Sequence, residues 1–163
     1  MDILHYQKEF ISYLESKQWI HEPKNLYEPI DYILKLGGKR IRPVLTLMAA
    51  DIFSGDFKKA LPAALAVEVF HNFTLIHDDI MDAAPLRRGK ATVHKKWDTN
   101  TGILSGDAML IIAYQYFENY EPVVFQKLAI LFGKTALEVC DGQQLDVDFE
   151  TRNDVTIPEY INM

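Results

Sequence analysis

The chain has 163 residues, of which 48% are hydrophobic, and a formal net charge of −6. This length suffices for one globular domain with a hydrophobic core, and the negative charge argues against a nucleic-acid binder that relies on phosphate attraction. The single cysteine, Cys140, rules out an internal disulfide and favours a reducing compartment. No signal-peptide pattern opens the chain and no apolar run reaches about 18 residues, so we expect a cytoplasmic protein.

Hydrophobic periodicity predicts helices joined by short breaks. The first two helices are expected at 3–19 and 26–36, the second ending at Gly37-Gly38. Pro43 suits the first turn of a third helix that runs to about Phe53. The clearest pattern follows, with apolar residues spaced by four, and a polar, basic loop comes after it. The remaining predictions are a helix at 58–82, a loop at 83–92, and helices at about 94–100, 105–119, 122–150 and 157–163.

No convincing period-two strand is present. Residues 111–114 favour a strand by propensity alone, but their flanks have a helical pattern. The predicted fold class is therefore all-α, with residues 1–163 forming a single α-helical domain. Pro158 opens a helix just before the chain stops at Met163, and a few helical residues cannot bury a face. A fragment of a longer protein is therefore one expectation.

The segment Asp78-Asp79-Ile80-Met81-Asp82 packs three carboxylates into five residues at the end of the longest predicted helix. On a helix, Asp78 and Asp82 share one face at a separation of about 6 Å along the axis. Like charges at this spacing repel each other, and three aspartates near a helix C-terminus also oppose the helix dipole. A cation between them would relieve both effects. Carboxylate oxygens suit Mg²⁺, which takes one or two carboxylates together with substrate phosphates.

A polar stripe continues these aspartates back along the helix at steps of three or four residues. Glu68, His71 and either Thr74 or Leu75 fall on it. The structural alternative is a solvated face of an amphipathic helix, but such faces normally interleave lysine and arginine, which this stripe lacks. We therefore favour a functional interpretation for the three aspartates, whereas His71 alone fits either one.

Two basic clusters accompany the aspartates. Arg87-Arg88-Gly89-Lys90 follows them on the predicted loop, where arginine forks suit bidentate phosphate contacts; a plain salt-bridge patch is the alternative. The second cluster, from Gly37 to Pro43, precedes a helix N-terminus that favours anions. It lacks the outer glycine and the Ser/Thr of a Walker loop.

A third polar cluster runs from Asp141 to Asp148. Within it Gln143 and Asp146 are three residues apart and share a helix face. By itself this segment favours an ordinary polar helix surface with a tolerated glycine.

Taken together, these motifs resemble the trans-isoprenyl diphosphate synthases, the polyprenyl synthetase family. Five segments match in order and spacing across roughly residues 35–150, which is more specific than any one motif. They are Gly37-Gly38-Lys39-Arg40-Ile41-Arg42-Pro43, the run from Glu68 to Asp82, Pro85-Leu86-Arg87-Arg88-Gly89, Gly106-Asp107 and Gly142-Gln143-Gln144-Leu145-Asp146. The resemblance implies a helical bundle of the isoprenoid synthase type, truncated to its N-terminal half.

The resemblance also implies an activity: condensation of isopentenyl diphosphate with an allylic diphosphate, by Mg²⁺-dependent ionisation, condensation and elimination. Asp78, Asp79 and Asp82 resemble the first aspartate-rich motif, which binds Mg²⁺, and Arg87 resembles the arginine that contacts the allylic diphosphate. Lys39, Arg42, His71 and Arg88 resemble the residues that form the pocket for isopentenyl diphosphate. Gln143 and Asp146 resemble the pair that faces the metal cluster and the reacting allyl group.

Residues just before the first aspartate motif set the depth of the product tunnel in this family. Phe73 and Thr74 occupy the fifth and fourth positions upstream. An aromatic residue there, without an insertion in the motif, implies a short-chain product of about C15 to C20.

The chain departs from the family pattern because it has no second aspartate-rich motif. We expect it to be inactive or nearly so by itself, and to expose apolar surface that promotes association. A homodimer or higher association is the expected assembly, without nucleic acid and without stable membrane insertion.

Three alternatives remain open. A metal-dependent phosphohydrolase of the HD type would use His71 and the pair His77-Asp78, although a helical histidine is more often packed than metal-bound. A terpene cyclase has no second diphosphate to hold, so Lys39, Arg42 and Arg88 argue against it. A non-catalytic subunit or fragment is the third, and the intact aspartates and arginines argue against a long-standing non-catalytic role.

Overall fold

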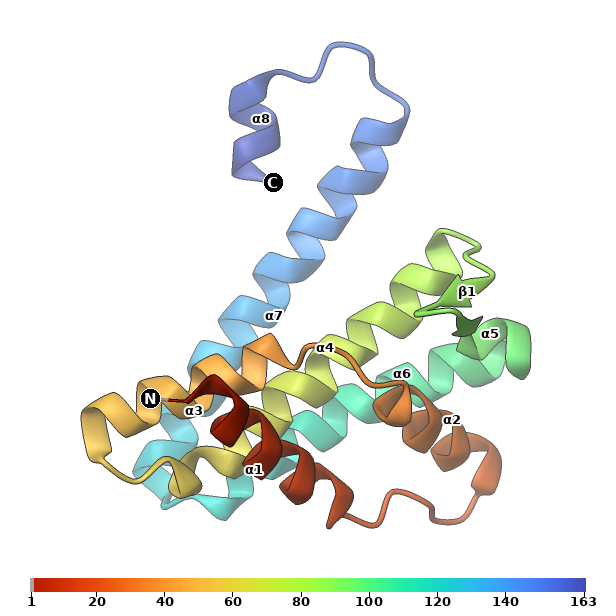
Figure 1. Ribbon diagram of the computed structural model, residues 1–163. Coiled ribbons are helices and arrows are strands. Elements are labelled where there is room, and N and C mark those ends of the chain that lie inside the picture. The colour runs from red at the N-terminus through yellow and green to blue at the C-terminus, as the bar shows by residue number, and fades with distance from the viewer. Residues whose placement is uncertain (1) are drawn as a thin grey trace. The chain divides into compact units, whose positions relative to one another are not determined.

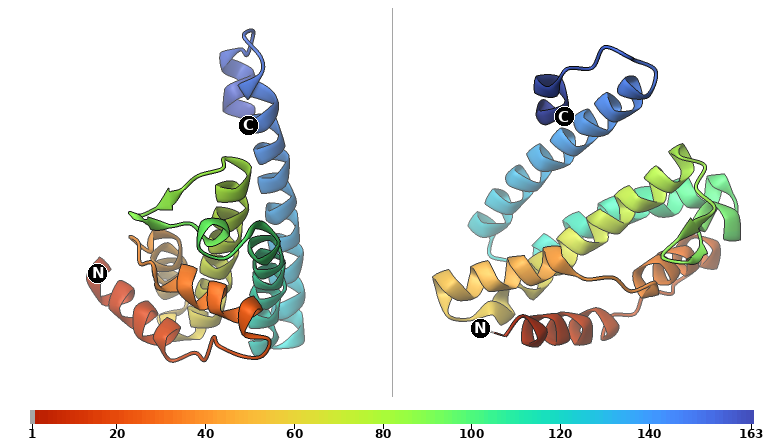
Figure 2. Two further views of the ribbon diagram at one scale, coloured as in Figure 1. Left: turned by 90° about the vertical axis from the view of Figure 1, so that its right-hand side faces the viewer. Right: turned by 45° about the horizontal axis from the view of Figure 1, so that its top comes forward.

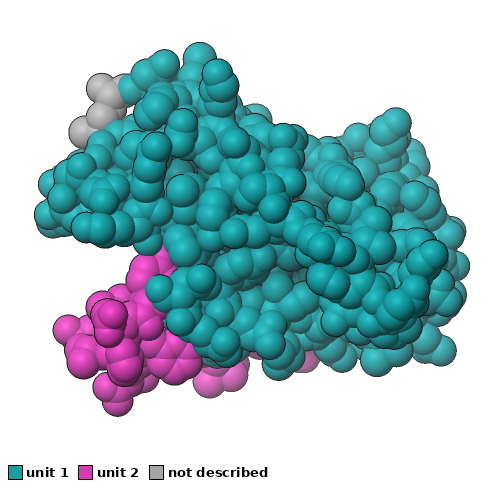
Figure 3. Space-filling view, turned by 90° about the horizontal axis from the view of Figure 1, so that it is seen from below, with its two compact units in different colours: residues 1–119 teal, residues 120–163 magenta. Residues whose placement is uncertain are grey.

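The computed structural model describes residues 2–163, which contain eight α-helices, two short 3₁₀ turns and one small hairpin (Figure 1). The all-α fold class is confirmed. Two compact units make up the chain, residues 1–119 and 120–163 (Figure 3), and each is described by itself. The single domain over 1–163 stays a prediction.

Unit 1 begins with three helices: α1 (Ile3–Glu15), α2 (Lys24–Lys35) and α3 (Ile41–Ser54). The first ends four residues before the predicted boundary. Its N-terminus is capped by Asp2, whose side chain accepts a hydrogen bond from the Leu4 amide at 3.0 Å. All three helices bury apolar faces, and the second basic cluster, from Gly37 to Pro43, spans the loop between α2 and α3 and the first turn of α3.

The centre of unit 1 is the pair formed by α4 (Leu61–Met81) and α6 (Thr99–Gln115), which lie side by side in both views of Figure 2. The 3₁₀ turn η1 (Phe57–Ala60) precedes α4, so the predicted helix 58–82 begins with a different helical type. Two buried glycines allow the close approach of α6 to α4: Gly102, which lies against Ile80, and Gly106, which lies against His77. The strand alternative at 111–114 lies inside α6 and is wrong.

The predicted loop at 83–92 contains a hairpin, which corrects the expectation that no strand forms. Its strands are β1 (Leu86–Arg87) and β2 (Lys90–Ala91), which pair antiparallel. The two turn residues, Arg88 and Gly89, have φ of 53° and 75°. Positive φ at both central positions is the geometry of a type I′ turn, which matches the twist of a hairpin.

The predicted helix at 94–100 is interrupted. Only α5 (Val93–Lys96) forms, because Asp98 takes an extended conformation and caps the next helix. The Asp98 side chain accepts a hydrogen bond from the Thr101 amide at 2.9 Å. As a result, α6 begins six residues before the predicted start at 105, and the short turn η2 (Tyr116–Asn119) follows it.

Unit 2 contains α7 (Pro122–Glu150) and α8 (Ile157–Asn162), close to the predicted 122–150 and 157–163. Thr156 and Glu159 form a capping box at the start of α8. Throughout residues 2–163, no helix combines the length and the apolar character that crossing a membrane requires.

Candidate functional site

The three aspartates at the end of α4 have different surroundings. Asp79 is 1% exposed, and both of its carboxylate oxygens accept hydrogen bonds from Arg87 Nε at 2.9 Å. Asp78 is half-buried and Asp82 is exposed. Burial raises the pKa of Asp78, and the like charge of Asp82 raises it further. The pair that repels across the helix face is therefore Asp78 and Asp82, as their spacing predicts.

A divalent cation would fit these two carboxylates. No set of three His, Cys, Asp or Glu side chains within residues 2–163 is arranged to hold a metal ion. Mg²⁺ takes only one or two carboxylates when substrate phosphates supply other ligands, and Asp78 and Asp82 provide that number. Asp79 is already committed to Arg87, so its predicted role as a metal ligand stays a prediction.

The hairpin gives its two arginines different partners. Arg87 pairs with Asp79, and its Nη2 lies 2.7 Å from Asp79 Oδ1. Arg88 Nη1 donates to the backbone carbonyl of Gly37, in the loop between α2 and α3. A Cβ at position 38 would lie 2.9 Å from the guanidinium carbon of Arg88, so Gly38 is required for this close approach. The hairpin therefore connects the aspartates to the second basic cluster, from Gly37 to Pro43.

A cavity of about 410 Å³ lies where this cluster faces α4. Four of its lining side chains are the predicted isopentenyl diphosphate residues Lys39, Arg42, His71 and Arg88. Arg88 converges with Lys39 and Arg42 although 49 and 46 residues separate it from them in the chain. Of the four cations in the lining, Arg40 is paired with Glu68, which leaves three cations and a histidine for a polyanion such as a diphosphate. The complete lining is Gly38, Lys39, Arg40, Ile41, Arg42, Glu68, His71 and Arg88.

His71 is uncharged at neutral pH. Burial lowers its pKa, the charge of Arg42 lowers it further, and the result is a pKa of about 4. Arg42 Nη1 lies 3.3 Å from His71 Nε2, a geometry in which a neutral imidazole accepts a hydrogen bond from the guanidinium. The sequence left open whether His71 is a functional residue or part of a solvated helix face. Its contact with Arg42, another residue of the cavity lining, favours the functional interpretation.

Phe73 and Thr74 do not line this cavity. The Phe73 ring packs edge-on against the His77 ring, with 4.7 Å between their centroids, while Thr74 Oγ1 donates to the His71 carbonyl at 2.9 Å. His77 in turn lies against α6, where its Nε2 is 3.3 Å from the Ile103 carbonyl oxygen. The role of Phe73 and Thr74 in setting product length stays a prediction.

Gln143 and Asp146 belong to α7 in unit 2. The first is half-buried and the second is exposed. Asp146 lines a shallow cavity with Arg152 and residues of α8. The proposed role of this pair beside the aspartates of unit 1 stays a prediction.

The sequence does not predict that Arg40 and Glu68 pair with each other. They are 6% and 2% exposed and form a buried ion pair. Glu68 falls on the predicted polar stripe of α4, but helical spacing does not show that its carboxylate is buried against a residue of the loop between α2 and α3. Asn72, one turn later, donates through Nδ2 to the Glu68 carbonyl at 2.7 Å, so α4 buries polar groups where a solvated face was the alternative.

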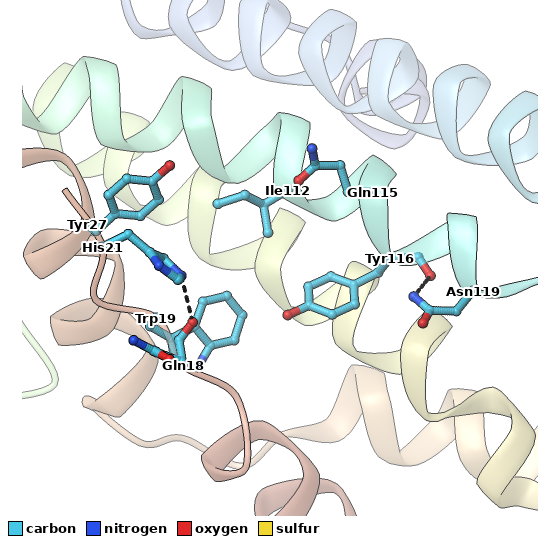
Figure 4. A pocket seen from close by; sticks show the side chains of 8 residues that line it. All are labelled: Gln18, Trp19, His21, Tyr27, Ile112, Gln115, Tyr116 and Asn119. Carbon is cyan, nitrogen blue, oxygen red and sulfur yellow. Dashed lines mark hydrogen bonds between the residues drawn. The ribbon is translucent and has the colours of Figure 1, made fainter. Parts of the chain in front are cut away.

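A second cavity, of about 300 Å³, lies between the α1–α2 connection and the end of α6 (Figure 4). Aromatic side chains form much of its wall, and His21 Nε2 lies 3.0 Å from the Gln18 carbonyl oxygen. Its lining carries no carboxylate, lysine or arginine, so it lacks groups for binding a charged diphosphate. The lining residues are Gln18, Trp19, His21, Tyr27, Ile112, Gln115, Tyr116 and Asn119.

Comparisons with known proteins agree with this geometry. Residues 23–163 match the sequence model of the polyprenyl synthetase family. A geranylgeranyl diphosphate synthase of Methanosarcina mazei is 44% identical over 146 residues, 88% of this chain and 45% of the relative. A geranylfarnesyl diphosphate synthase of Natronomonas pharaonis is 38% identical over 176 residues, 96% of this chain and 52% of the relative.

Solved structures give the same result. A crystal structure of a geranylgeranyl pyrophosphate synthase superposes with a TM-score of 0.97 at 61% identity, covering 99% of this chain and 50% of the other. The geranylgeranyl pyrophosphate synthetase of Geoglobus acetivorans superposes with a TM-score of 0.85 at 36% identity, and the match covers 98% of this chain and 52% of the other. The chain thus spans about half the length of the relatives it matches.

Proposed function

Because the chain belongs to the polyprenyl synthetase family, we propose that it is the substrate-binding N-terminal half of a prenyltransferase. The complete site condenses isopentenyl diphosphate with an allylic diphosphate to give a short-chain polyprenyl diphosphate. The observation that carries this proposal is the convergence of Lys39, Arg42 and Arg88 with His71 on one cavity, linked through the hairpin to the aspartates of α4.

Each charged group has a separate task in this proposal. Asp78 and Asp82 would hold Mg²⁺, which would supply positive charge to the allylic diphosphate as it leaves. Asp79 holds the Arg87 guanidinium through Nε at 2.9 Å and Nη2 at 2.7 Å, which leaves Nη1 for the same diphosphate. Fixed cations stabilise charge that develops on a leaving group without reorganising at the moment of reaction.

The cavity beside His71 receives the second diphosphate. Lys39, Arg42 and Arg88 provide the positive charge, while the neutral imidazole provides a hydrogen-bonding group. Because this cavity lies wholly within residues 38–88, we expect unit 1 to bind isopentenyl diphosphate without a contribution from unit 2. Gln143 and Asp146 of α7 face the metal and the allyl group in this proposal.

The names of the relatives support the product class. The synthases that this chain matches are named for geranylgeranyl and geranylfarnesyl diphosphates, both of which are short-chain products. The first has 20 carbons and lies within the range of about C15 to C20 expected from Phe73, and the second has 25 and lies above it. A cytoplasmic location and a homodimer complete the proposal. Within it, prenyl transfer requires further residues, so the 163-residue chain alone binds substrate without turnover.

Isothermal titration of isopentenyl diphosphate into the chain tests the proposal. We expect saturable binding that is at least about tenfold weaker in Arg42→Met, because a charged hydrogen-bonding partner is lost. Lys58→Met is the matched control, since it removes one exposed positive charge from unit 1, where Lys58 lies 3.7 Å from Glu9. Equal affinity in both variants would contradict the assignment of the cavity.

The phosphohydrolase alternative is not favoured. Its histidine-aspartate pair would need His77 beside a metal, whereas the His77 ring packs on Phe73 and contacts the Ile103 carbonyl. The relatives named above are prenyl diphosphate synthases.

A further inference from the structure

Arg40 differs from the other cations of the loop between α2 and α3. Lys39 and Arg42 are exposed, whereas Arg40 is 6% exposed. All three contribute to the lining of the cavity assigned to isopentenyl diphosphate. A buried arginine between two exposed cations points to a task other than direct phosphate binding.

Arg40 contacts three helices. Its guanidinium Nη1 donates to Glu68 Oε1 on α4, and Nη2 donates to the Leu34 carbonyl in the last turn of α2. Arg40 is itself the residue that precedes α3, and its backbone carbonyl accepts the Val44 amide at 3.2 Å. Glu68 Oε1 receives a second donor, Asn72 Nδ2, at 3.3 Å. The ion pair is therefore buried, and each of its charged groups has further hydrogen-bonding partners.

The Arg40 backbone is left-handed, with φ of 51° and ψ of 36°. A non-glycine residue rarely adopts this conformation, and it persists where the surroundings impose it. Here the side-chain bonds to Glu68 and Leu34 supply that constraint. The same backbone bend separates Lys39 from Arg42, so it sets the direction in which each of the two residues leaves the loop.

We propose that Arg40 is a positioning residue. Its buried ion pair with Glu68 fixes the left-handed start of α3 and thereby presents Lys39 and Arg42 to a diphosphate, while Arg40 itself does not bind phosphate. This inference rests on the proposed function and adds a residue pair that acts through the binding residues. It also explains why an acid beside the cavity does not repel the ligand: the Glu68 charge is matched by Arg40.

The direction in which one substitution changes the affinity for isopentenyl diphosphate tests the proposal. Glu68→Gln removes a negative charge near a proposed diphosphate cavity. If Arg40 were a phosphate ligand, this change would free it and binding of isopentenyl diphosphate would tighten. The positioning role predicts the opposite, at least about tenfold weaker binding by isothermal titration well below the melting temperature. Tighter or unchanged binding would overturn the proposal.

A double variant separates positioning from stability. Arg40→Met/Glu68→Met replaces both charges, and such replacements of buried pairs are often neutral or stabilising. We expect its melting temperature to approach that of the unsubstituted chain while its affinity stays about tenfold weaker. If both the melting temperature and the affinity recovered, the ion pair would have a purely structural role, and the proposal would be overturned. Lys58→Met, outside the cavity, controls for the loss of one positive charge.

A measurement without ligand distinguishes failure of this inference from failure of the proposed function. In the double variant, amide hydrogen exchange should accelerate across residues 37–42 while α4 remains protected. Unchanged exchange in that loop would overturn the positioning role even if binding were weakened. If the unsubstituted chain binds no isopentenyl diphosphate, the proposed function fails, and the exchange comparison alone decides whether Arg40 fixes the loop.

Discussion

Asp79 and Asp82 differ in environment although both belong to one short acidic motif. Asp79 is buried against Arg87, whereas Asp82 projects from the exposed end of α4. A buried carboxylate that loses its charge leaves its cationic partner without compensation. The two positions therefore form a matched pair for substitution.

Asp79→Asn should lower the free energy of unfolding by about 2 kcal/mol, because Arg87 then lacks a charged partner. Asp82→Asn should change it by less than about 0.5 kcal/mol in the absence of Mg²⁺, as is usual at exposed sites. Urea denaturation of both variants measures the difference. Equal effects at the two positions would show that the Asp79–Arg87 pair does not stabilise the end of α4.

His71 gives a pH-dependent prediction. Its pKa falls from 6.5 in the unfolded chain to about 4 in the folded chain, mainly through burial. The folded state therefore loses stability as the pH falls from about 6.5 towards 4, because the unfolded state binds the proton first. The stability difference between the unsubstituted chain and His71→Gln should decline over that window. An NMR titration of the imidazole with a midpoint near 6.5 would contradict this account.

At the residue scale, the sequence predicted which side chains meet but not how each is used. The shared face of Asp78 and Asp82 follows from helix spacing alone. The burial of Asp79, and the inward direction of Arg40, depend on contacts with residues far away in the chain, which spacing does not contain. Periodicity therefore could not separate the ligand candidates from the residues that position them.

At the element scale, Gly106 marks the tightest approach of α6 to α4. A Cβ at Gly106 would overlap Nε2 of His77, and the His77 ring also packs on Phe73. Small residues are required where helices approach closely.

Gly106→Ala should lower the free energy of unfolding by about 1 to 3 kcal/mol through overpacking, although alanine is the better helix former. The second substitution in His77→Ala/Gly106→Ala removes the overlapping ring and should recover part of the loss. Thermal and urea denaturation of the single and double variants measure both effects. A more stable Gly106→Ala would mean that the two helices separate at no cost.

The long helix α4 was predictable because its apolar residues recur at a spacing of four. Pro122 and Glu150 bound α7 as periodicity indicates. The hairpin and the break between α5 and α6 were missed because they depend on local chemistry: a type I′ turn at Arg88-Gly89 and the cap at Asp98. Both features are only a few residues long, below the length at which periodicity is informative.

At the scale of the whole molecule, α3 exposes large apolar side chains. Leu45 and Ile52 are 58% and 63% exposed, and Phe53 is 90% exposed. Exposed apolar surface of this kind favours association. Light scattering should therefore show a mass that rises with concentration, and Leu45→Ser/Ile52→Ser should reduce it. A constant monomer mass at high concentration would contradict the prediction.

In the proposed function, this chain binds the diphosphates but supplies only one part of a prenyltransferase site. The most direct test of this function is transfer from an allylic diphosphate to labelled isopentenyl diphosphate, measured for the chain alone and for the chain joined to the C-terminal half of the Methanosarcina mazei relative. We predict no product above background from the chain alone. The joined protein should form a Mg²⁺-dependent polyprenyl diphosphate, and Asp78→Asn/Asp82→Asn should abolish it. Robust transfer by the chain alone, or a folded joined protein that binds both substrates without forming product, would contradict the account.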